Sequence, residues 1–189
     1  YLTTDYRNMM DNLELLKTGT LAMFKLSKAE RGCVAVKEDK VDLIAELKKT
    51  FEGTPIEIRT VPDIYPAGWE RTLIYMLTGK RYDRLPAEAG CILNNVSTCI
   101  ALGNALKNGM PITTKYLTVS GDGVTTPQNV VAPVGTPASE IIKACGGYVG
   151  EDCLLIAGGP MMGMSINRTD IPVTKGTSGI IALGDEGVT

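Results

Sequence analysis

Short, apolar, β-branched runs alternate with longer segments of helical periodicity over the first 110 residues, and this alternation restricts the fold more than any other feature. Gly32–Val36, Ile56–Val61 and the shorter Cys91–Leu93 are the apolar runs, and a helical pattern follows each of them. A helix between two strands returns the chain to the edge where the first strand began, so the strands pair in parallel. The pattern therefore predicts an α/β protein with a partial Rossmann-like layered sheet.

The expected helices are bounded by recognisable start and stop signals. Asn12 is a predicted N-cap for the first helix, Asp39 opens the second, and Gly79 closes the third as its C-terminal cap. Apolar residues at helical spacing define the face of each helix that we expect to point inward. In chain order, these residues are Leu15, Gly19, Ala22 and Leu26; Val41, Ile44, Leu47 and Phe51; Leu73, Ile74 and Leu77; and Val96, Ile100, Gly103 and Leu106.

The last third of the chain has a different pattern. Tyr116–Ser120 alternates apolar and polar residues, Gly121–Gly123 supplies a turn, and Asn129–Val134 resumes a strand, which together predict a hairpin. A Thr-Pro pair at position 136 is typical of a helix start, and Cys153–Ala157 is a further apolar run. Two strands, a helix and more strands in so short a stretch predict a small α+β domain of the β-grasp type.

Charge and residue types exclude several classes of function. Histidine is absent, which removes Ser-His and Cys-His nucleophiles and histidine metal ligands. The 19 Lys and Arg residues against 21 Asp and Glu residues give a net charge of −2, which argues against a nucleic-acid binder. No apolar run approaches the roughly 20 residues of a membrane span.

The cysteines indicate the redox compartment of the protein, and the first residues are compared with the pattern of a signal peptide. The five cysteines include no C-x-x-C pair, and an odd number gives no disulfide framework. We expect buried, reduced thiols in a cytosolic protein, with a metal or cluster ligand as the alternative. The chain starts at Tyr1 without the charged, apolar and small-residue order of a signal peptide, and we interpret this start as the cut edge of a longer chain.

The stretch Asn94-Asn95-Val96-Ser97-Thr98 joins an expected strand to an expected helix. The first N–H groups of a helix and its dipole favour an anion, and amide and hydroxyl side chains add hydrogen bonds to a phosphate. Capping of the helix by Asn94 or Asn95 is the more ordinary role of such residues. Two adjacent asparagines exceed what a cap requires, so both interpretations stay open.

A second candidate, Tyr65-Pro66-Ala67-Gly68-Trp69-Glu70, also leads from a loop into a helix. Tyr65 is suited to stacking on a planar ring, and Glu70 is suited to accepting hydrogen bonds from ribose hydroxyls. The alternative is ordinary helix chemistry, in which Glu70 favours the first turn and the aromatic residues pack.

A third candidate, Gly158–Met164, contains two consecutive glycines, a proline and three methionines. We interpret it as a tight turn whose methionines fill a core or an interface, with a surface for a partner as the alternative. It matches neither G-x-G-x-x-G nor a P-loop.

Taken together, these stretches resemble the RnfC family, the C-type component of the Rnf electron-transport complex, which is a membrane-associated NADH:ferredoxin oxidoreductase. The first region is also similar to the flavoprotein subunit of respiratory complex I, and the second to the SLBB β-grasp domain that follows it. The resemblance rests on Tyr1–Arg7, Tyr65–Glu70, Leu73–Gly79, Asn94–Thr98, Val119–Asp122, Gly158–Gly163 and Pro172–Thr177.

The resemblance implies that residues 1–110 are the C-terminal part of a domain that binds FMN and NADH. It implies that residues 111–165 are an SLBB domain and that residues 166–189 are a strand and linker toward an iron–sulfur domain. FMN would take a hydride from NADH and pass electrons toward 4Fe-4S clusters. The residues that the resemblance places beside flavin and nucleotide are Tyr65, Gly68, Glu70, Asn94, Asn95 and Thr98. Trp69 stands where that family usually has glycine.

The resemblance also implies partners and a location. The partners would be the other subunits of the membrane complex and NADH, with ferredoxin reached indirectly, on the cytoplasmic face of the membrane. A glycine-rich flavin loop and two cluster-binding cysteine runs of that family are missing, so we expect the chain to fold without oxidising NADH or holding a cluster. Two other functions stay open: a corrinoid reductase of metabolic microcompartments, and a non-catalytic binding or docking module over residues 112–165.

Overall fold

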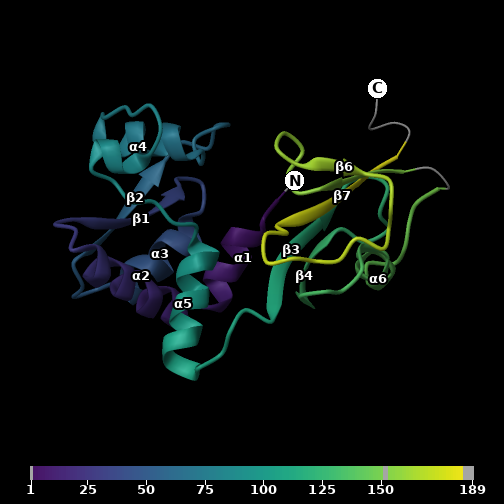
Figure 1. Cartoon of the computed structure of the whole chain (residues 1–189), viewed down its shortest axis with the longest axis horizontal. Helices are drawn as coiled ribbons and strands as arrows, with labels where there is room; N and C mark the ends of the chain where they lie inside the picture. The colour runs from purple at the N-terminus through teal and green to yellow at the C-terminus, as the bar shows by residue number, and fades with distance from the viewer. Residues whose placement is uncertain (1, 151–152, 185–189) are drawn as a thin grey trace. The chain divides into compact units, whose positions relative to one another are not determined.

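The computed structural model describes residues 2–150 and 153–184 of the chain. The described residues form two compact units (Figure 1). The βαβ unit comprises Met9–Gly109, and the sheet unit comprises residues 2–8 with the described residues from Met110 onward. The α/β class predicted from the sequence is confirmed. The sequence analysis assigns residues 2–8 to the first region, whereas in the structure they belong to the sheet unit.

The βαβ unit is built around two parallel strands and the helices that flank them. Strands β1 and β2 pair from Gly32 opposite Ile56 to Lys37 opposite Val61, and α3 is the crossover between them, as predicted. The elements are α1 (Thr4–Asp11, which begins in the sheet unit), α2 (Leu13–Ser27), β1 (Gly32–Lys37), α3 (Val41–Thr50), β2 (Ile56–Val61), α4 (Glu70–Thr78), a 3₁₀ turn (Pro86–Ala89) and α5 (Val96–Asn108).

The buried faces of the helices differ in part from the predicted ones. Helix α3 buries Leu43 and Leu47 and leaves Val41 exposed, because Val41 is the first residue of the helix. Leu26 and Leu106 are also exposed, since each lies in the last turn of its helix. The buried apolar residues of this unit include Leu16, Val34, Val36, Leu43, Leu47, Phe51, Ile56, Ile74 and Ile100.

The third strand predicted at Cys91–Leu93 is wrong. The segment pairs with neither β1 nor β2, and the backbone N–H of Cys91 donates instead to the carbonyl of Pro86 at 3.0 Å. Its side chains still alternate, because Cys91 and Leu93 pack on a small core of Ile74, Tyr82 and Ala89 while Ile92 is exposed. Alternating burial thus arises here without a ladder of backbone hydrogen bonds.

Helices α2 and α5 lie side by side (Figure 1). At their crossing the two backbones are so close that no side chain fits between them. A Cβ atom built on Gly19 would lie 1.7 Å from the carbonyl oxygen of Cys99, and one built on Gly103 would lie 2.0 Å from that of Leu15. Only glycine fits at either position, because each carbonyl occupies the space of a side chain. The crossing fixes where α5 lies, and with it the segment that precedes α5.

The sheet unit has the strand order β4-β3-β7-β5-β6. Strands β3 and β7 at the centre are parallel and the other pairs are antiparallel, which is the arrangement predicted as a β-grasp. The elements are β3 (Thr114–Ser120), β4 (Gln128–Pro133), α6 (Ala138–Ala144), β5 (Leu154–Ala157), β6 (Met164–Ile166) and β7 (Gly179–Leu183). The sequence analysis places residues 166–189 outside the SLBB domain, as a strand and linker. In the structure, β7 from this segment lies at the centre of the sheet.

Helix α6 covers one face of this sheet. Ile141, Ile142 and the adjacent Cys145 are buried against residues of the central strands such as Leu117 and Ile180. The helix begins at Ala138 with Pro137 in the N-cap position, one residue later than the Thr-Pro pattern predicts.

The turn between β5 and β6 differs from its prediction in one respect. It is tight, as expected, because Gly158 has a φ of 106° and the N–H of Gly163 donates to the carbonyl of Gly159 at 2.7 Å. Its methionines, however, do not fill the core: Met161, Met162 and Met164 are all exposed. The short hairpin turns these side chains outward, since the sheet core is already filled by α6 and the central strands.

The first residues of the chain are attached to the sheet unit by hydroxyl groups. Thr4 Oγ1 lies 2.6 Å from Thr118 Oγ1 of β3 and donates to the carbonyl of Ser178 at 2.9 Å. Thr118 Oγ1 donates in turn to Asn129 Oδ1 of β4 at 2.7 Å. Thr4 and Thr118 are buried. Residues from the start, middle and end of the chain thus meet in one polar network.

Candidate functional site

The N-terminus of α5 presents amide and hydroxyl groups to solvent. Asn95 is the N-cap, and its Oδ1 accepts a hydrogen bond from the backbone N–H of Ser97 at 2.8 Å. Asn94 and Thr98 are exposed on either side of this cap. Capping therefore accounts for Asn95 but not for Asn94, and the cap leaves the positive end of the helix dipole beside two further polar side chains.

The turn before α4 is closed by backbone hydrogen bonds and anchored by one buried residue. The N–H of Ala67 donates to the carbonyl of Ile64 at 2.9 Å, the N–H of Trp69 donates to the carbonyl of Pro66 at 2.8 Å, and Ala67 is fully buried. The Tyr65–Pro66 peptide bond is cis. Tyr65, Gly68 and Trp69 are exposed on the outside of this turn.

Gly68 has no structural requirement for glycine. Its φ is not positive, and a Cβ atom built on it would meet no other atom within 4 Å. Both usual reasons for a glycine, a left-handed backbone and a close neighbour, are therefore absent at this position in the structure. The open space above Gly68 is accessible to a ligand.

Glu70 is held by a residue that the sequence analysis does not single out. One carboxylate oxygen of Glu70 accepts a hydrogen bond from the hydroxyl of Tyr82 at 2.6 Å. Burial of the Tyr82 ring, together with this bond to a carboxylate, raises the pKa of Tyr82 to about 12. Tyr82 thus occupies one acceptor position of Glu70 and orients its carboxylate, whose second oxygen is the one that the ribose role would use.

Arg71 and Glu88 fix the loop that carries Tyr82. The guanidinium of Arg71 donates to the carbonyls of Tyr82 and Asp83 at 3.0 and 2.6 Å and lies 5.0 Å from the centre of the Tyr82 ring. The Glu88 carboxylate accepts from the backbone N–H groups of Asp83, Arg84 and Leu85, and these bonds lower its pKa. The sequence shows only a polar loop here, with no pattern that pairs it with α4.

A shared apolar cluster links the two halves of the candidate site. Ile74 of α4 packs with Tyr82 and Ala89, and Cys91 and Leu93, just before Asn94, pack on the same cluster. Helix α4 and the segment that leads into α5 therefore pack on one small core of the βαβ unit. The hydrogen bonds described for Glu70 and Asn95 go to Tyr82 and Ser97, and each half is positioned by its own local contacts.

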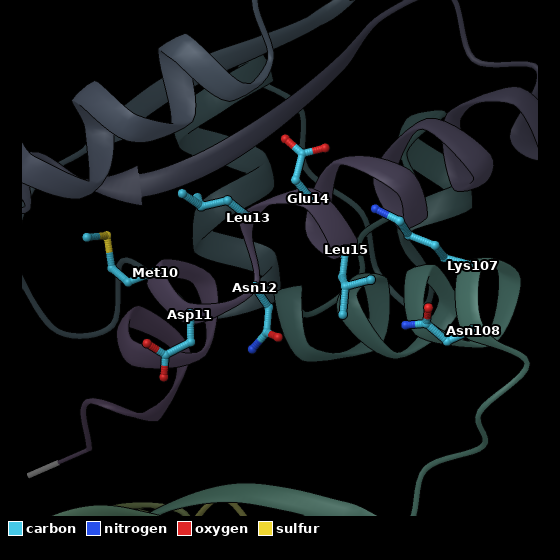
Figure 2. Close-up of a pocket in the computed structure, with 8 residues that line it drawn as sticks. All are labelled: Met10, Asp11, Asn12, Leu13, Glu14, Leu15, Lys107 and Asn108. Atoms are coloured by element: carbon cyan, nitrogen blue, oxygen red, sulfur yellow. The ribbon is translucent and has the colours of Figure 1, made fainter.

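The six predicted site residues lie at the surface, where five are exposed and Glu70 is half-buried. A pocket of about 490 Å³ lies at the junction of α1 and α2 and the last turn of α5, which is the opposite end of α5 from Asn95 (Figure 2). It is lined by Met10, Asp11, Asn12, Leu13, Glu14, Leu15, Lys107 and Asn108. None of the six residues predicted to contact flavin or nucleotide lines it.

The cysteines differ in how far they are buried. All five are free thiols, and no group of three or more Cys, His, Asp or Glu residues is placed to hold a metal ion in residues 2–150 and 153–184. Cys99 and Cys145 are buried, which raises the pKa of both thiols. The expectation of burial is wrong for Cys33, which is exposed because its side chain points away from the core side of β1. Cys91 and Cys153 are half-buried.

A family model matches the region that contains this site. The model, described as the Nuo51 FMN-binding domain, matches residues 1–104, which is more than half of the chain. The chain belongs to the Nuo51 FMN-binding domain family. A second model, for the SLBB domain, matches residues 116–165 within the sheet unit. Both resemblances drawn from the sequence are thus confirmed.

Three curated relatives of this Nuo51-family chain carry different names. It is 38% identical over 185 residues to the C-type component of a proton-translocating ferredoxin:NAD(+) oxidoreductase complex of Clostridium ljungdahlii, covering 97% of the chain and 40% of the relative. It is 36% identical to the C-type component of a Na(+)-translocating complex of Acetobacterium woodii, with 98% and 43% covered. It is 35% identical to a cobalamin reductase of Salmonella typhimurium, with 96% and 40% covered. The chain spans about two fifths of the length of these relatives.

The residues of the Nuo51 domain fit a phosphorylated flavin in chemical type. The stretch Asn94–Thr98 offers amide and hydroxyl groups at a helix N-terminus and contains no carboxylate that would repel a phosphate. Tyr65 offers an exposed ring, and Gly68 leaves space beside it.

Among the described residues, none of the helices combines the length and the apolar character that a membrane span requires.

Proposed function

We propose that the βαβ unit holds the phosphate of FMN at the N-terminus of α5. The observation that carries the proposal is the pair of exposed polar residues, Asn94 and Thr98, beside the capped helix end in a domain of the FMN-binding family. A phosphate there is stabilised by the helix dipole and by neutral hydrogen-bond donors.

We further infer that the full-length protein is an electron-transfer subunit. It takes electrons from NADH through FMN toward iron–sulfur clusters, within a membrane-associated, ion-translocating NADH:ferredoxin oxidoreductase complex on the cytoplasmic face of the membrane. The names of the relatives from Clostridium ljungdahlii and Acetobacterium woodii support this role. Other subunits of that complex are the partners, and NADH is the electron donor.

Each site residue then has a defined part in binding. The Asn94 amide and the Thr98 hydroxyl donate to phosphate oxygens, and Asn95 keeps the first turn of α5 in place through Ser97. Tyr65 contacts a planar ring over Gly68. Glu70, oriented by Tyr82, accepts from a ribose hydroxyl with its second oxygen. When bound, FMN supplies the exchange between two-electron and one-electron chemistry, and the protein supplies binding and orientation.

A comparison of FMN with riboflavin tests the phosphate site, because the two ligands differ only in the phosphate. We expect the chain to bind FMN more tightly than riboflavin. An Asn94→Ala/Thr98→Ala variant is expected to lose about thirtyfold in FMN affinity, since it lacks two hydrogen bonds that together contribute about 2 kcal/mol. Its riboflavin affinity should stay unchanged.

Asn108→Ala is the matched control, because Asn108 lies on the same helix at its other end. It is expected to bind FMN as the unmodified chain does. Equal binding of FMN and riboflavin by the unmodified chain, measured by flavin fluorescence titration, contradicts the phosphate site.

A corrinoid reductase is the second candidate, and the identity to the Salmonella typhimurium cobalamin reductase favours it. The full-length protein separates the two candidates. Reduction of cob(III)alamin with NADH, without reduction of ferredoxin, supports the corrinoid reductase, and the reverse supports the Rnf-type role.

A further inference from the structure

Trp69, the single tryptophan of the chain, is exposed on the turn before α4. The residue is 54% accessible to solvent although Trp69 occupies the N-cap position of α4. The indole makes no capping hydrogen bond, so it does not serve the helix start. A tryptophan that neither caps nor is buried leaves much of a large apolar surface in water, which is unfavourable unless something covers it.

A second aromatic side chain on the same turn is exposed to a greater extent. Tyr65, four residues earlier, is 70% accessible to solvent. Between the two lies Gly68, above which the space is empty within 4 Å of a would-be Cβ. The turn thus carries two aromatic rings with a bare backbone position between them.

The turn is rigid enough to keep the two rings in place. Ala67 is completely buried and anchors the middle of the turn, and two backbone hydrogen bonds of 2.9 and 2.8 Å close it. The residues that follow are also fixed, because Glu70 and Arg71 both bind the loop around Tyr82. Little conformational freedom remains to be lost when a ligand binds such a turn, which favours affinity.

We propose that Trp69 is a ring-stacking residue that, together with Tyr65, binds the flat heteroaromatic ring of a flavin or of a nicotinamide adenine dinucleotide. The proposal deepens the proposed function and rests on it for the class of ligand. Isoalloxazine and adenine are both planar π systems. An indole recognises either ring in the same way, by stacking on one of its faces. Trp69 then determines which ring the site prefers.

Because Trp69 is the only tryptophan, its fluorescence reports on this turn alone. We expect acrylamide to quench the fluorescence of Trp69 efficiently in the free chain. Saturating ligand should reduce this quenching at least threefold. Titrations with FMN, riboflavin, NADH and AMP, each corrected for absorption with N-acetyltryptophanamide, show which ring is bound. AMP absorbs no tryptophan emission, so its effect reports contact rather than energy transfer. Unchanged acrylamide quenching with all four ligands overturns the proposal.

Two variants separate stacking from simple apolar contact. Trp69→Phe keeps a ring and is expected to bind the preferred ligand within about threefold of the unmodified chain. Trp69→Leu keeps an apolar side chain without a ring and is expected to bind it about tenfold more weakly, the size of one base–aromatic stack. Calorimetry gives these affinities without the fluorophore, and circular dichroism checks folding. Equal affinities for the Phe and Leu variants contradict stacking.

The same ligands distinguish failure of this proposal from failure of the phosphate site. Protection of Trp69 by riboflavin and FMN with equal affinity supports the stacking residue and contradicts the phosphate site. Tighter binding of FMN than riboflavin, with no effect of Trp69→Leu on either, supports the phosphate site and overturns the stacking residue.

Discussion

Replacing Gly19 by alanine introduces a methyl group where α2 meets the backbone of α5. The new Cβ would lie 1.7 Å from the carbonyl oxygen of Cys99, whereas ordinary contact begins near 3.4 Å. The helices must therefore separate by about 1.7 Å at their crossing. Overpacking typically costs about 1–3 kcal/mol, and a shift of this size falls at the upper end of that range. Alanine returns about 1 kcal/mol through its higher helix propensity.

The net effect expected for Gly19→Ala is a loss of about 2 kcal/mol in the free energy of unfolding. For a unit of about 100 residues this corresponds to a decrease in Tm of roughly 10 °C. Urea and thermal unfolding followed by far-ultraviolet circular dichroism measure both quantities, and Trp69 fluorescence follows the βαβ unit separately. A Gly19→Ala/Gly103→Ala variant should lose less than the sum of the two single variants, because the first methyl group already separates the helices.

Gly68→Ala is the matched control, since its Cβ would meet no atom within 4 Å. It is expected to change the free energy of unfolding by less than about 0.5 kcal/mol. The reasoning is refuted if Gly19→Ala unfolds at the midpoint of the unmodified chain or above it, because alanine would then gain its propensity without meeting α5.

Four further predictions concern the candidate site and the isolated chain. The pKa of Tyr82 is raised from 10.0 to about 12 in the folded state. The stability that Tyr82 contributes is therefore complete below pH 10 and is lost as the pH rises toward 12. Urea unfolding at a series of pH values should show this decline, and Tyr82→Phe should remove it. Asn95→Ala removes the cap of α5 and should lower the free energy of unfolding by about 1 kcal/mol, whereas no loss in urea unfolding would mean that Asn95 is not the cap. Gly68→Ala, neutral for stability, should weaken flavin or nucleotide binding by calorimetry, and unchanged binding would place the ligand elsewhere. The 189-residue chain should bind FMN more weakly than the full-length protein and hold no iron–sulfur cluster, and flavin fluorescence with iron analysis checks both statements.

The local elements of the fold are largely predictable from the sequence, and the long-range pairings are not. The β1–α3–β2 unit and the hairpin of β3 and β4 follow from periodicity, because burial repeats every 3.6 or every 2 residues. Cys91–Leu93 has the right alternation but no neighbour to pair with, and no local pattern distinguishes a paired strand from an unpaired one. Likewise, nothing near Gly179 indicates that β7 lies beside β3 at the centre of the sheet.

The contacts of the candidate site divide in the same way into local ones, which are predictable, and longer-range ones, which are not. The cap at Asn95 is a contact over two residues and follows from the residue type and its place before a helix. The bond from Tyr82 to Glu70 spans twelve residues and depends on how the loop around Glu88 folds, so spacing alone does not reveal it. Trp69 is visible in the sequence only as an aromatic residue, and its exposure is a property of the folded turn.

The hydroxyl network of Thr4, Thr118 and Ser178 has a consequence for how the protein is made. The sheet unit is discontinuous along the chain, since its first segment leaves the ribosome roughly a hundred residues before the rest of it. The βαβ unit is in effect an insertion between these parts and has a complete set of its own elements by Gly109. We expect it to fold during synthesis before Thr4 can bond to β3 and Ser178, so that the network closes only after the later segments of the sheet unit have been made.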